Sequence, residues 1–281
     1  MSTKLKAHTA AAAVAGKNGH SLISSDKFRQ LYAALVKYEL LHERMGLSSS
    51  DADGAASAVS ITLDLELEDT VVLSSRTFAA NFVKGVPVRT LLDHRNSSTN
   101  GSAIFYGAVN AWNSGAPSAV KQAGLATGAA LANKMAGNQK VAVAFIEGGA
   151  TALTECRVAL ELASTQKLPV LYVIEANLER RLGRILEEIS KMFPVVTVDA
   201  HDAVAVYRVA QESIVRARDG GPSLVVCVPY DQNGAKQNAV ANMEQYLAGK
   251  KLFRNQWKDQ ALAEFDREVG AACLPPANPL A

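Results

Sequence analysis

Apolar residues recur at every third or fourth position between Asp26 and Met45. This spacing places them on one face of a helix, and Ser25 stands where a capping side chain is expected. A polar stretch follows, and then residues 55–73, whose pattern fits either a helix or a strand and ends in a short apolar run. Residues 93–102, DHRNSSTNGS, are rich in turn formers and are predicted to form a loop.

The rest of the chain alternates regularly between apolar strands and amphipathic helices. Four continuous apolar strands separated by helices are typical of a parallel sheet covered on both faces. We therefore predict a single α/β, doubly wound domain over residues 23–281, with helical N- and C-terminal additions. The predicted strands are residues 141–146, 170–175, 195–199 and 223–230; the predicted helices are residues 119–135, a helix ending near Ser164, residues 179–191, residues 202–218 and two C-terminal helices.

Composition narrows the classes of function. The chain has 281 residues, 48% of them hydrophobic, and a net charge of +2 without a basic stripe, so neither nucleic acid nor a membrane surface is an expected partner. No apolar run approaches the length that spans a membrane. Three well-separated cysteines suit buried thiols in the cytoplasm. Residues 1–22 are predicted to be a flexible lead-in rather than a targeting peptide.

The sequence AFIEGGATALTEC, residues 144–156, predicts a strand that breaks at two glycines and continues as a helix. Such turns present backbone N–H groups to phosphates. Two acidic residues argue against this use, since Glu147 lies in the turn and Glu175 ends the next strand. The third glycine of a dinucleotide-binding motif is missing, and Glu175 lies beyond the usual spacing for its ribose-binding acid.

The helix predicted over residues 119–135 has small residues four positions apart, at Gly124, Gly128 and Ala132. Glycine inside a helix costs about 1 kcal/mol relative to alanine, so two of them indicate a close helix contact. The contact could lie against the sheet, against another helix of the fold or across a subunit interface.

These stretches resemble the alpha subunit of the thiamine-diphosphate-dependent 2-oxo acid dehydrogenases, the E1 components of pyruvate, branched-chain and acetoin dehydrogenase. Residues 141–178 resemble the family's diphosphate and metal motif, and residues 65–87 and 123–137 support the likeness, which runs from about Asp26 to Gly270. The resemblance implies the thiamine-diphosphate-binding fold, a doubly wound, mostly parallel sheet with helices on both faces. By family, thiamine diphosphate and Mg²⁺ would be the cofactors.

The resemblance also locates the positions where this chain departs from the motif Gly-Asp-Gly-Ala. Gly148 stands where the family has a magnesium-binding aspartate, and Glu147 replaces the preceding glycine, whose backbone lies close to the diphosphate. Gly149 and Ala150 keep the rest of the motif. Asn177 matches the asparagine that supplies a second metal ligand, and is the vestigial metal residue.

At further positions, too, this sequence lacks residues that bind the cofactor in the family. A basic residue that holds the diphosphate in some members is Glu175 here, and a Tyr-Arg pair becomes Ser75 and Arg76, so only the arginine remains. The family has a longer loop after the position of Asn177 and a histidine-bearing segment after the position of Tyr230, and this sequence has neither. The degenerate cofactor site implied by the family thus consists of Arg76, Glu147, Gly148, Gly149, Ala150, Glu175 and Asn177, with no catalytic residue assigned.

Two other candidates have simpler explanations. Asp199, His201 and Asp202 could suggest metal ligands, but Asp202 is placed to cap the helix that follows it. Cys156, one turn into the helix after the glycines, could be an activated thiolate or a buried structural thiol; with no histidine near it in the sequence, the structural role is favoured.

The altered charges favour an E1-alpha-like protein that has lost cofactor binding and catalysis and that acts in a homo-oligomer or beside an E1-beta-like subunit. The first alternative is a working alpha subunit for oxidative decarboxylation of a 2-oxo acid or an acetoin-like substrate. It would use Asn177 and either Glu147 or Glu175 as metal ligands. The second alternative is a module that binds another anion or a nucleotide at the same turn.

Overall fold

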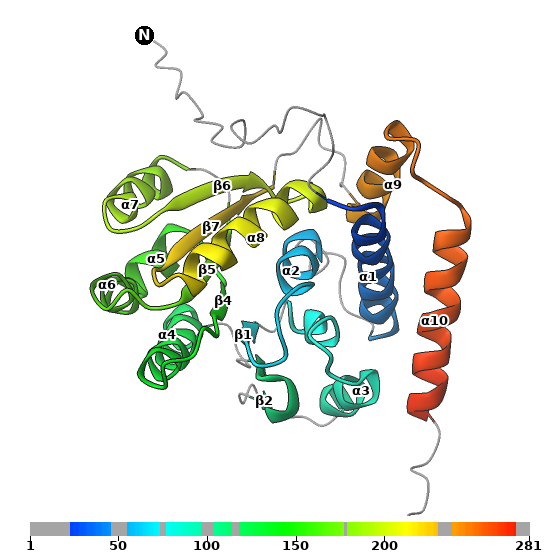
Figure 1. Cartoon of the computed structure of the whole chain (residues 1–281), viewed down its shortest axis with the longest axis horizontal. Coiled ribbons are helices and arrows are strands. Elements are labelled where there is room, and N and C mark those ends of the chain that lie inside the picture. The colour runs from blue at the N-terminus through cyan, green and yellow to red at the C-terminus, as the bar shows by residue number, and fades with distance from the viewer. Residues whose placement is uncertain are drawn as a thin grey trace, which may run out of the picture.

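The computed structural model describes residues 23–45, 55–73, 77–96, 104–113, 118–176, 179–229 and 238–273. The predicted lead-in, residues 1–22, lies outside these ranges. Within them the chain forms a seven-stranded sheet in the order β2-β3-β1-β4-β5-β7-β6 (Figure 1). The strands are β1 (Thr70–Leu73), β2 (Ile104–Tyr106), β3 (Ala111–Asn113), β4 (Ala142–Ile146), β5 (Val170–Glu175), β6 (Val195–Asp199) and β7 (Ser223–Val228).

The sheet confirms the predicted α/β class. Every pair of neighbouring strands is parallel except β2 and β3, which run antiparallel at one edge. The four strands predicted from apolar runs are β4 to β7, and β5 and β6 have the predicted bounds. The short strands β1, β2 and β3 extend the sheet beyond what the pattern alone predicted.

Helices cover both faces of the sheet. Side chains alternate along each strand, so neighbouring residues of one strand contact opposite helical layers. Val143 and Phe145 of β4 enter one hydrophobic cluster, while Ala144 and Ile146 enter the other. The face with Ala144 is covered by α4 (Ala119–Met135), α5 (Ala150–Glu155), α6 (Arg157–Thr165) and α7 (Arg180–Ser190). The opposite face is covered by α1 (Ser25–Arg44), α2 (Ala55–Thr62), α3 (Val88–Asn96), α8 (Ala203–Arg218), α9 (Ala239–Gly249) and α10 (Gln256–Cys273).

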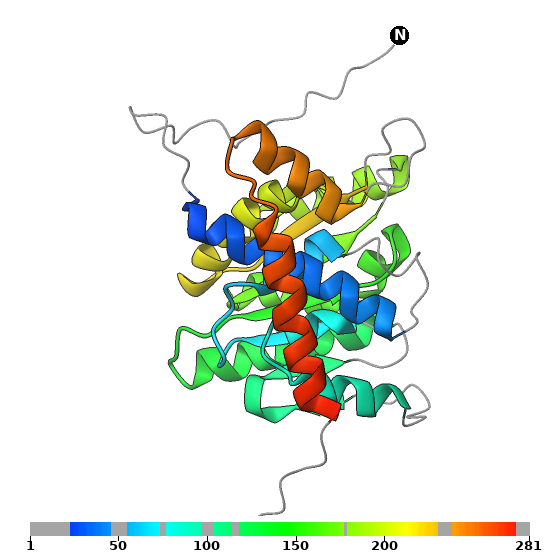
Figure 2. The same ribbon diagram turned by 90° about the vertical axis from the view of Figure 1, so that its right-hand side faces the viewer.

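The N-terminal helix and the C-terminal helix form an outer layer. Figure 2 shows α10 crossing over α1, and the two helices are in contact. Lys37 of α1 joins them through ion pairs with Glu264 at 3.1 Å and Glu268 at 2.7 Å. The predicted first helix is confirmed, but its capping residue was wrong: the Ser24 side chain accepts the Lys27 N–H at 3.1 Å, because the helix begins one residue after Ser24.

One open alternative is resolved and one local prediction is corrected. Residues 55–73, ambiguous from the pattern, form both candidates in succession, first α2 and then β1. The predicted loop over residues 93–102 is wrong for residues 93–96, which complete α3 because Val88 and Leu91 are buried and anchor that helix. Residues 97–102 lie outside the described ranges.

The other predicted helices agree with the structure to within a few residues, with one break. The helix after the glycine turn divides into α5 and α6 at Cys156, which closes the first and opens the second. In the part of the chain that the structure describes, no helix is both long and apolar enough to span a membrane.

Candidate functional site

The glycine turn follows the end of β4 and leads into α5. Gly148 has a φ of +103°, and a Cβ atom added there would lie 3.0 Å from the Cβ of Ala152. The backbone N–H of Glu147 donates to the side-chain oxygen of Gln122 in α4 at 3.0 Å. The predicted strand–turn–helix is therefore present, with Ala150 as the first residue of the helix.

The turn occupies a position where open parallel sheets bind ligands. From β1 the chain leads to β3 on one side of the sheet, and from β4 it leads to β5 on the other. Ligands of such sheets bind beyond the carboxyl ends of the strands, at the point where the strand order reverses. The turn after β4 lies at this point.

Glu175 ends β5, the strand next to β4. Its side-chain Oε2 accepts a hydrogen bond from the Ser57 hydroxyl at 3.1 Å. Ser57 belongs to α2, on the sheet face opposite α5. Glu175 is also level with Cys227 in β7, where burial, together with the Glu175 charge, raises the pKa of the thiol. The carboxylate is thus tied to the α2 side of the sheet.

The structure brings part of the predicted site together. Glu147, Gly148, Gly149 and Ala150 form the turn, and Glu175 ends the adjacent strand. Two further predicted residues, Arg76 and Asn177, lie outside the described ranges.

The described part of this site lacks one side-chain ligand of the family's magnesium centre. Gly148 supplies no side-chain oxygen at the position where the family has its metal-binding aspartate. Among the described residues, no group of three or more histidine, cysteine, aspartate or glutamate side chains could hold a metal ion. Mg²⁺ needs near-octahedral oxygen ligands, commonly one or two carboxylates beside phosphate oxygens.

The two structural alternatives weighed in the sequence are borne out. Asp202 caps α8, since its Oδ1 accepts the N–H groups of Val204 at 3.0 Å and Ala205 at 2.9 Å. Cys156 is buried, and burial, with a smaller contribution from the Glu155 charge, raises the pKa of its thiol to about 12. A thiol with this pKa is protonated at neutral pH and is a poor nucleophile.

The small-residue helix is α4, and its two glycines face away from the sheet. Gly124 and Gly128 are exposed, and a Cβ atom added at either would meet no heavy atom within 4 Å. The sheet contacts are made by the opposite side of α4, which includes Ala123 and Ala130. Packing of the glycines against the sheet is therefore wrong as an explanation of their spacing.

Two side chains that hold the site were missed in the sequence. Gln122 is fully buried and supports the turn from α4; its place between Ala119 and Ala123, on the alanine-rich side of the helix, was a signal that could have indicated it. Ser57 supports Glu175 from a segment whose pattern was ambiguous, so nothing in the sequence pointed to it.

The chain is similar to one family of known proteins over most of its length. The family described as "Dehydrogenase E1 component" matches residues 27–238. The acetoin:2,6-dichlorophenolindophenol oxidoreductase alpha subunit of Bacillus subtilis is 36% identical over 121 residues, covering 39% of this chain and 36% of the relative. Its counterpart in Cupriavidus necator is 39% identical over 114 residues, covering 37% and 34%.

A pyruvate dehydrogenase E1 component alpha subunit, from Rhizobium meliloti, is 30% identical over 125 residues, or 40% of this chain and 36% of the relative. The matched segment thus spans little more than a third of the length of each of these three relatives.

Proposed function

Since the chain belongs to the dehydrogenase E1 component family, we propose that it is an alpha-subunit-like member that has lost cofactor binding and catalysis. Its role is that of a structural or partner subunit. The family depends on thiamine diphosphate, and the named relatives are alpha subunits. The sheet and its helical layers keep the framework of such a subunit. The turn after β4 lacks the aspartate that binds magnesium in the family.

Gly148 is the observation that carries this proposal. The residue offers no side-chain ligand atom, and its φ of +103° is a backbone conformation that an aspartate rarely adopts. An aspartate at this position would therefore be strained on the backbone that the turn has here.

The charge of Glu147 adds a second argument. Glu147 brings negative charge to the turn where a diphosphate would bind, whereas the Glu175 carboxylate is held on the α2 side of the sheet. At about 4 Å and an effective dielectric of about 20, one like-charge contact costs on the order of 4 kcal/mol.

Recruitment of Glu175 as a replacement metal ligand is opposed by its hydrogen bond with Ser57. To reach the α5 side of the turn, the carboxylate would have to give up that bond. This supports the loss of the metal site over its rearrangement.

Calorimetry tests the loss of cofactor binding. The full chain is titrated with thiamine diphosphate in the presence of Mg²⁺, first alone and then mixed with an E1-beta-like subunit, and the titration is repeated with EDTA in place of the metal. We expect no saturable heat under any condition. Micromolar binding that disappears with EDTA would overturn the proposal and favour a working alpha subunit acting on a 2-oxo acid or acetoin-like substrate.

The outer surface of α4 and α6 supports a partner-subunit role. Val120 and Met135 of α4 are 54% and 80% exposed, and Val158 and Leu162 of α6 are 78% and 41% exposed. The two helices lie next to each other at the outer side of the sheet (Figure 1). Apolar side chains gathered on adjacent elements mark sites of protein association, and small residues let another helix approach closely.

Sedimentation velocity tests this surface. The chain is measured alone, for a homo-oligomer, and with an E1-beta-like subunit. We expect Gly128→Leu to weaken the association at least about tenfold, because a leucine side chain there keeps the partner helix away. Gly183→Leu, at an exposed glycine of α7 with equally open space, is the matched control. Equal association of both variants would exclude α4 from the interface.

A further inference from the structure

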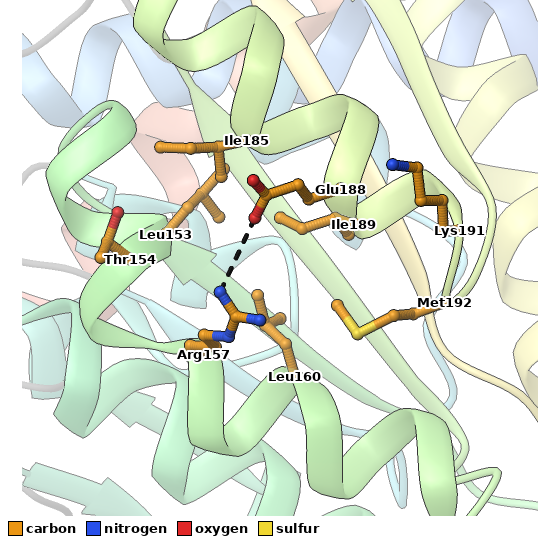
Figure 3. Close-up of a pocket in the computed structure, with 9 residues that line it drawn as sticks. All are labelled: Leu153, Thr154, Arg157, Leu160, Ile185, Glu188, Ile189, Lys191 and Met192. Carbon is orange, nitrogen blue, oxygen red and sulfur yellow. Dashed lines mark ion pairs between the residues drawn. The ribbon is translucent and has the colours of Figure 1, made fainter.

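A cavity of about 520 Å³ lies between α5 and α6 on one side and α7 on the other (Figure 3). None of its lining residues belongs to the glycine turn or to the end of β5. Its volume falls within the range of sites for small molecules, about 300–1,000 Å³. The cavity is lined by Leu153, Thr154, Arg157, Leu160, Ile185, Glu188, Ile189, Lys191 and Met192.

The floor of the cavity is apolar. Leu153, Leu160 and Ile189 are at most 3% exposed and form its base, and they belong to the hydrophobic cluster under this face of the sheet. Ile185 and Met192 are partly buried and pack against the same cluster. Because Leu153, Leu160 and Ile189 are already buried, the apolar surface that a ligand could cover belongs mainly to Ile185 and Met192, and each Å² of it removed from water gains about 25 cal/mol.

Charged side chains surround this floor. Arg157 of α6 and Glu188 of α7 form an ion pair at 3.6 Å that crosses from one helix to the other, as the dashed line in Figure 3 shows. Their side chains are 64% and 62% exposed. Exposed ion pairs contribute about 0–1 kcal/mol, so the Arg157–Glu188 pair can open at little cost. Arg157 would keep its ion pair with Glu161 at 2.7 Å.

Lys191 is the lining cation without an ion pair among the described residues, whereas Arg157 is paired with both Glu161 and Glu188. The lining contains two cations, Arg157 and Lys191, and one carboxylate, Glu188. Lys191 is exposed and forms no ion pair with any other described residue. An anionic group at this margin would meet a lysine that is not already neutralised.

We propose that this cavity binds a small monocarboxylate with an extended apolar body, of the medium-chain fatty acid type. Its hydrocarbon part lies along Ile185 and Met192, over the buried floor, and its carboxylate pairs with Lys191 and with Arg157 once the contact to Glu188 opens. This site is independent of the proposed loss of thiamine diphosphate binding. It gives the chain a ligand whether or not the turn after β4 is functional.

Calorimetry on the full chain tests the proposal, with decanoate and with decanol as ligands. Decanoate is kept below its critical micelle concentration. Decanoate is expected to bind saturably at one site, and decanol, which has the same chain but no charge, to bind about three- to tenfold more weakly. Lys191→Gln should weaken decanoate by a similar factor and leave decanol unchanged. Lys121→Gln removes an exposed lysine of α4 and is the matched control.

A second pair of variants tests the apolar floor. Ile185→Trp should fill the cavity and abolish the binding of both compounds, while Val215→Trp, at an exposed valine of α8, should leave both unchanged. The proposal is overturned by equal affinities for decanoate and decanol, by an unchanged decanoate affinity in Lys191→Gln, or by the absence of saturable binding. It is also overturned if Lys191→Gln alters the sedimentation coefficient instead, since the groove would then be a subunit contact.

Discussion

Arg218, in the last turn of α8, forms a two-point ion pair with the buried Asp69 just before β1, with Nη1 and Oδ1 2.9 Å apart. Asp69 also accepts the backbone N–H groups of Glu66 and Val141, each at 2.9 Å. Arg218 in turn donates to the carbonyl oxygen of Gln139 at 3.0 Å. One ion pair thus fixes the entry of β1, the entry of β4 and the end of α8.

Replacing Arg218 with glutamine should lower the free energy of unfolding by about 3 kcal/mol, because it leaves the Asp69 carboxylate buried without its cation. The arginine is 21% exposed, which places the effect at the lower end of the range for such pairs. Urea unfolding at neutral pH measures the change. Arg216→Gln, whose exposed pair with Glu212 is 3.4 Å long, should stay within about 0.5 kcal/mol of the wild type. Equal losses in the two variants would contradict the role of Arg218.

Lys84 should make stability depend on pH above neutrality. Its side chain is buried beside this ion pair, its amine donates to the carbonyl oxygen of Glu66, and burial lowers its pKa from 10.5 to about 8. Between these two values the unfolded chain holds a proton that the folded chain has lost, so this lysine makes stability rise as the pH increases from about 8 toward 10.

Urea unfolding at about pH 7.5 and about pH 9.5 measures this rise, expected on the order of 1 kcal/mol. Lys84→Met should remove it, while Lys121→Met, at an exposed lysine of α4, is the control for the loss of a lysine charge. A rise of the same size in Lys84→Met would show that other groups cause it.

The sequence predicted those elements whose signals are local. β5 and β6 have the predicted bounds, and the Asp202 cap identified the start of α8. In contrast, β2 and β3 contain three residues each; β3 pairs with β1 and β2 pairs with β3, and no local pattern records this pairing. Residues 93–96 show the opposite failure, because buried residues earlier in α3 outweigh their turn-forming composition.

One part of the candidate site could be predicted from local sequence, and another part depends on contacts between distant residues. The glycine turn follows from local sequence, as strand, two glycines and helix. The hydrogen bond between Ser57 and Glu175 joins residues 118 positions apart, and it depends on how α2 packs over the sheet. The direction of the Glu175 side chain could therefore not be predicted from its position at the end of a strand.

The glycines of α4 should respond to alanine according to their backbone. Gly124 lies inside the helix with open space around it, so Gly124→Ala should stabilise the isolated chain by about 0.5–1 kcal/mol. Gly137, just after the helix, has a φ of +67°, and Gly137→Ala should destabilise by about 1 kcal/mol. Thermal unfolding at equal concentrations compares them. A loss in Gly124→Ala would indicate that the glycine already packs against a second subunit.

The buried thiols should be inert in the folded chain. Burial raises the pKa of Cys156 to about 12, and Cys227 is also buried with a raised pKa. In a Cys273→Ser background, a colourless disulfide reagent at mildly alkaline pH should report no fast thiol in the native protein and both thiols in denaturant. Val158→Cys, at a 78% exposed position, should react at once and serves as the positive control. Rapid native reaction of either buried cysteine would require local opening of its helix or strand.

Restoring the family's aspartate at Gly148 should destabilise the chain. A side chain at a φ of +103° is strained, and its Cβ would lie 3.0 Å from that of Ala152, so Gly148→Ala and Gly148→Asp should each cost about 1–2 kcal/mol. Gly183→Ala, at an exposed helical glycine with open space, should instead be neutral or stabilising. Urea unfolding gives these differences.

Calorimetry of Gly148→Asp with thiamine diphosphate and Mg²⁺ then separates the two parts of the proposed loss. We expect no binding, because the side chain cannot reach a metal from this backbone without a change in the turn. Unchanged stability together with new, metal-dependent binding would mean that the turn accommodates an aspartate. In that case the missing carboxylate, rather than the path of the chain through Glu147 and Gly148, would be the cause of the lost site.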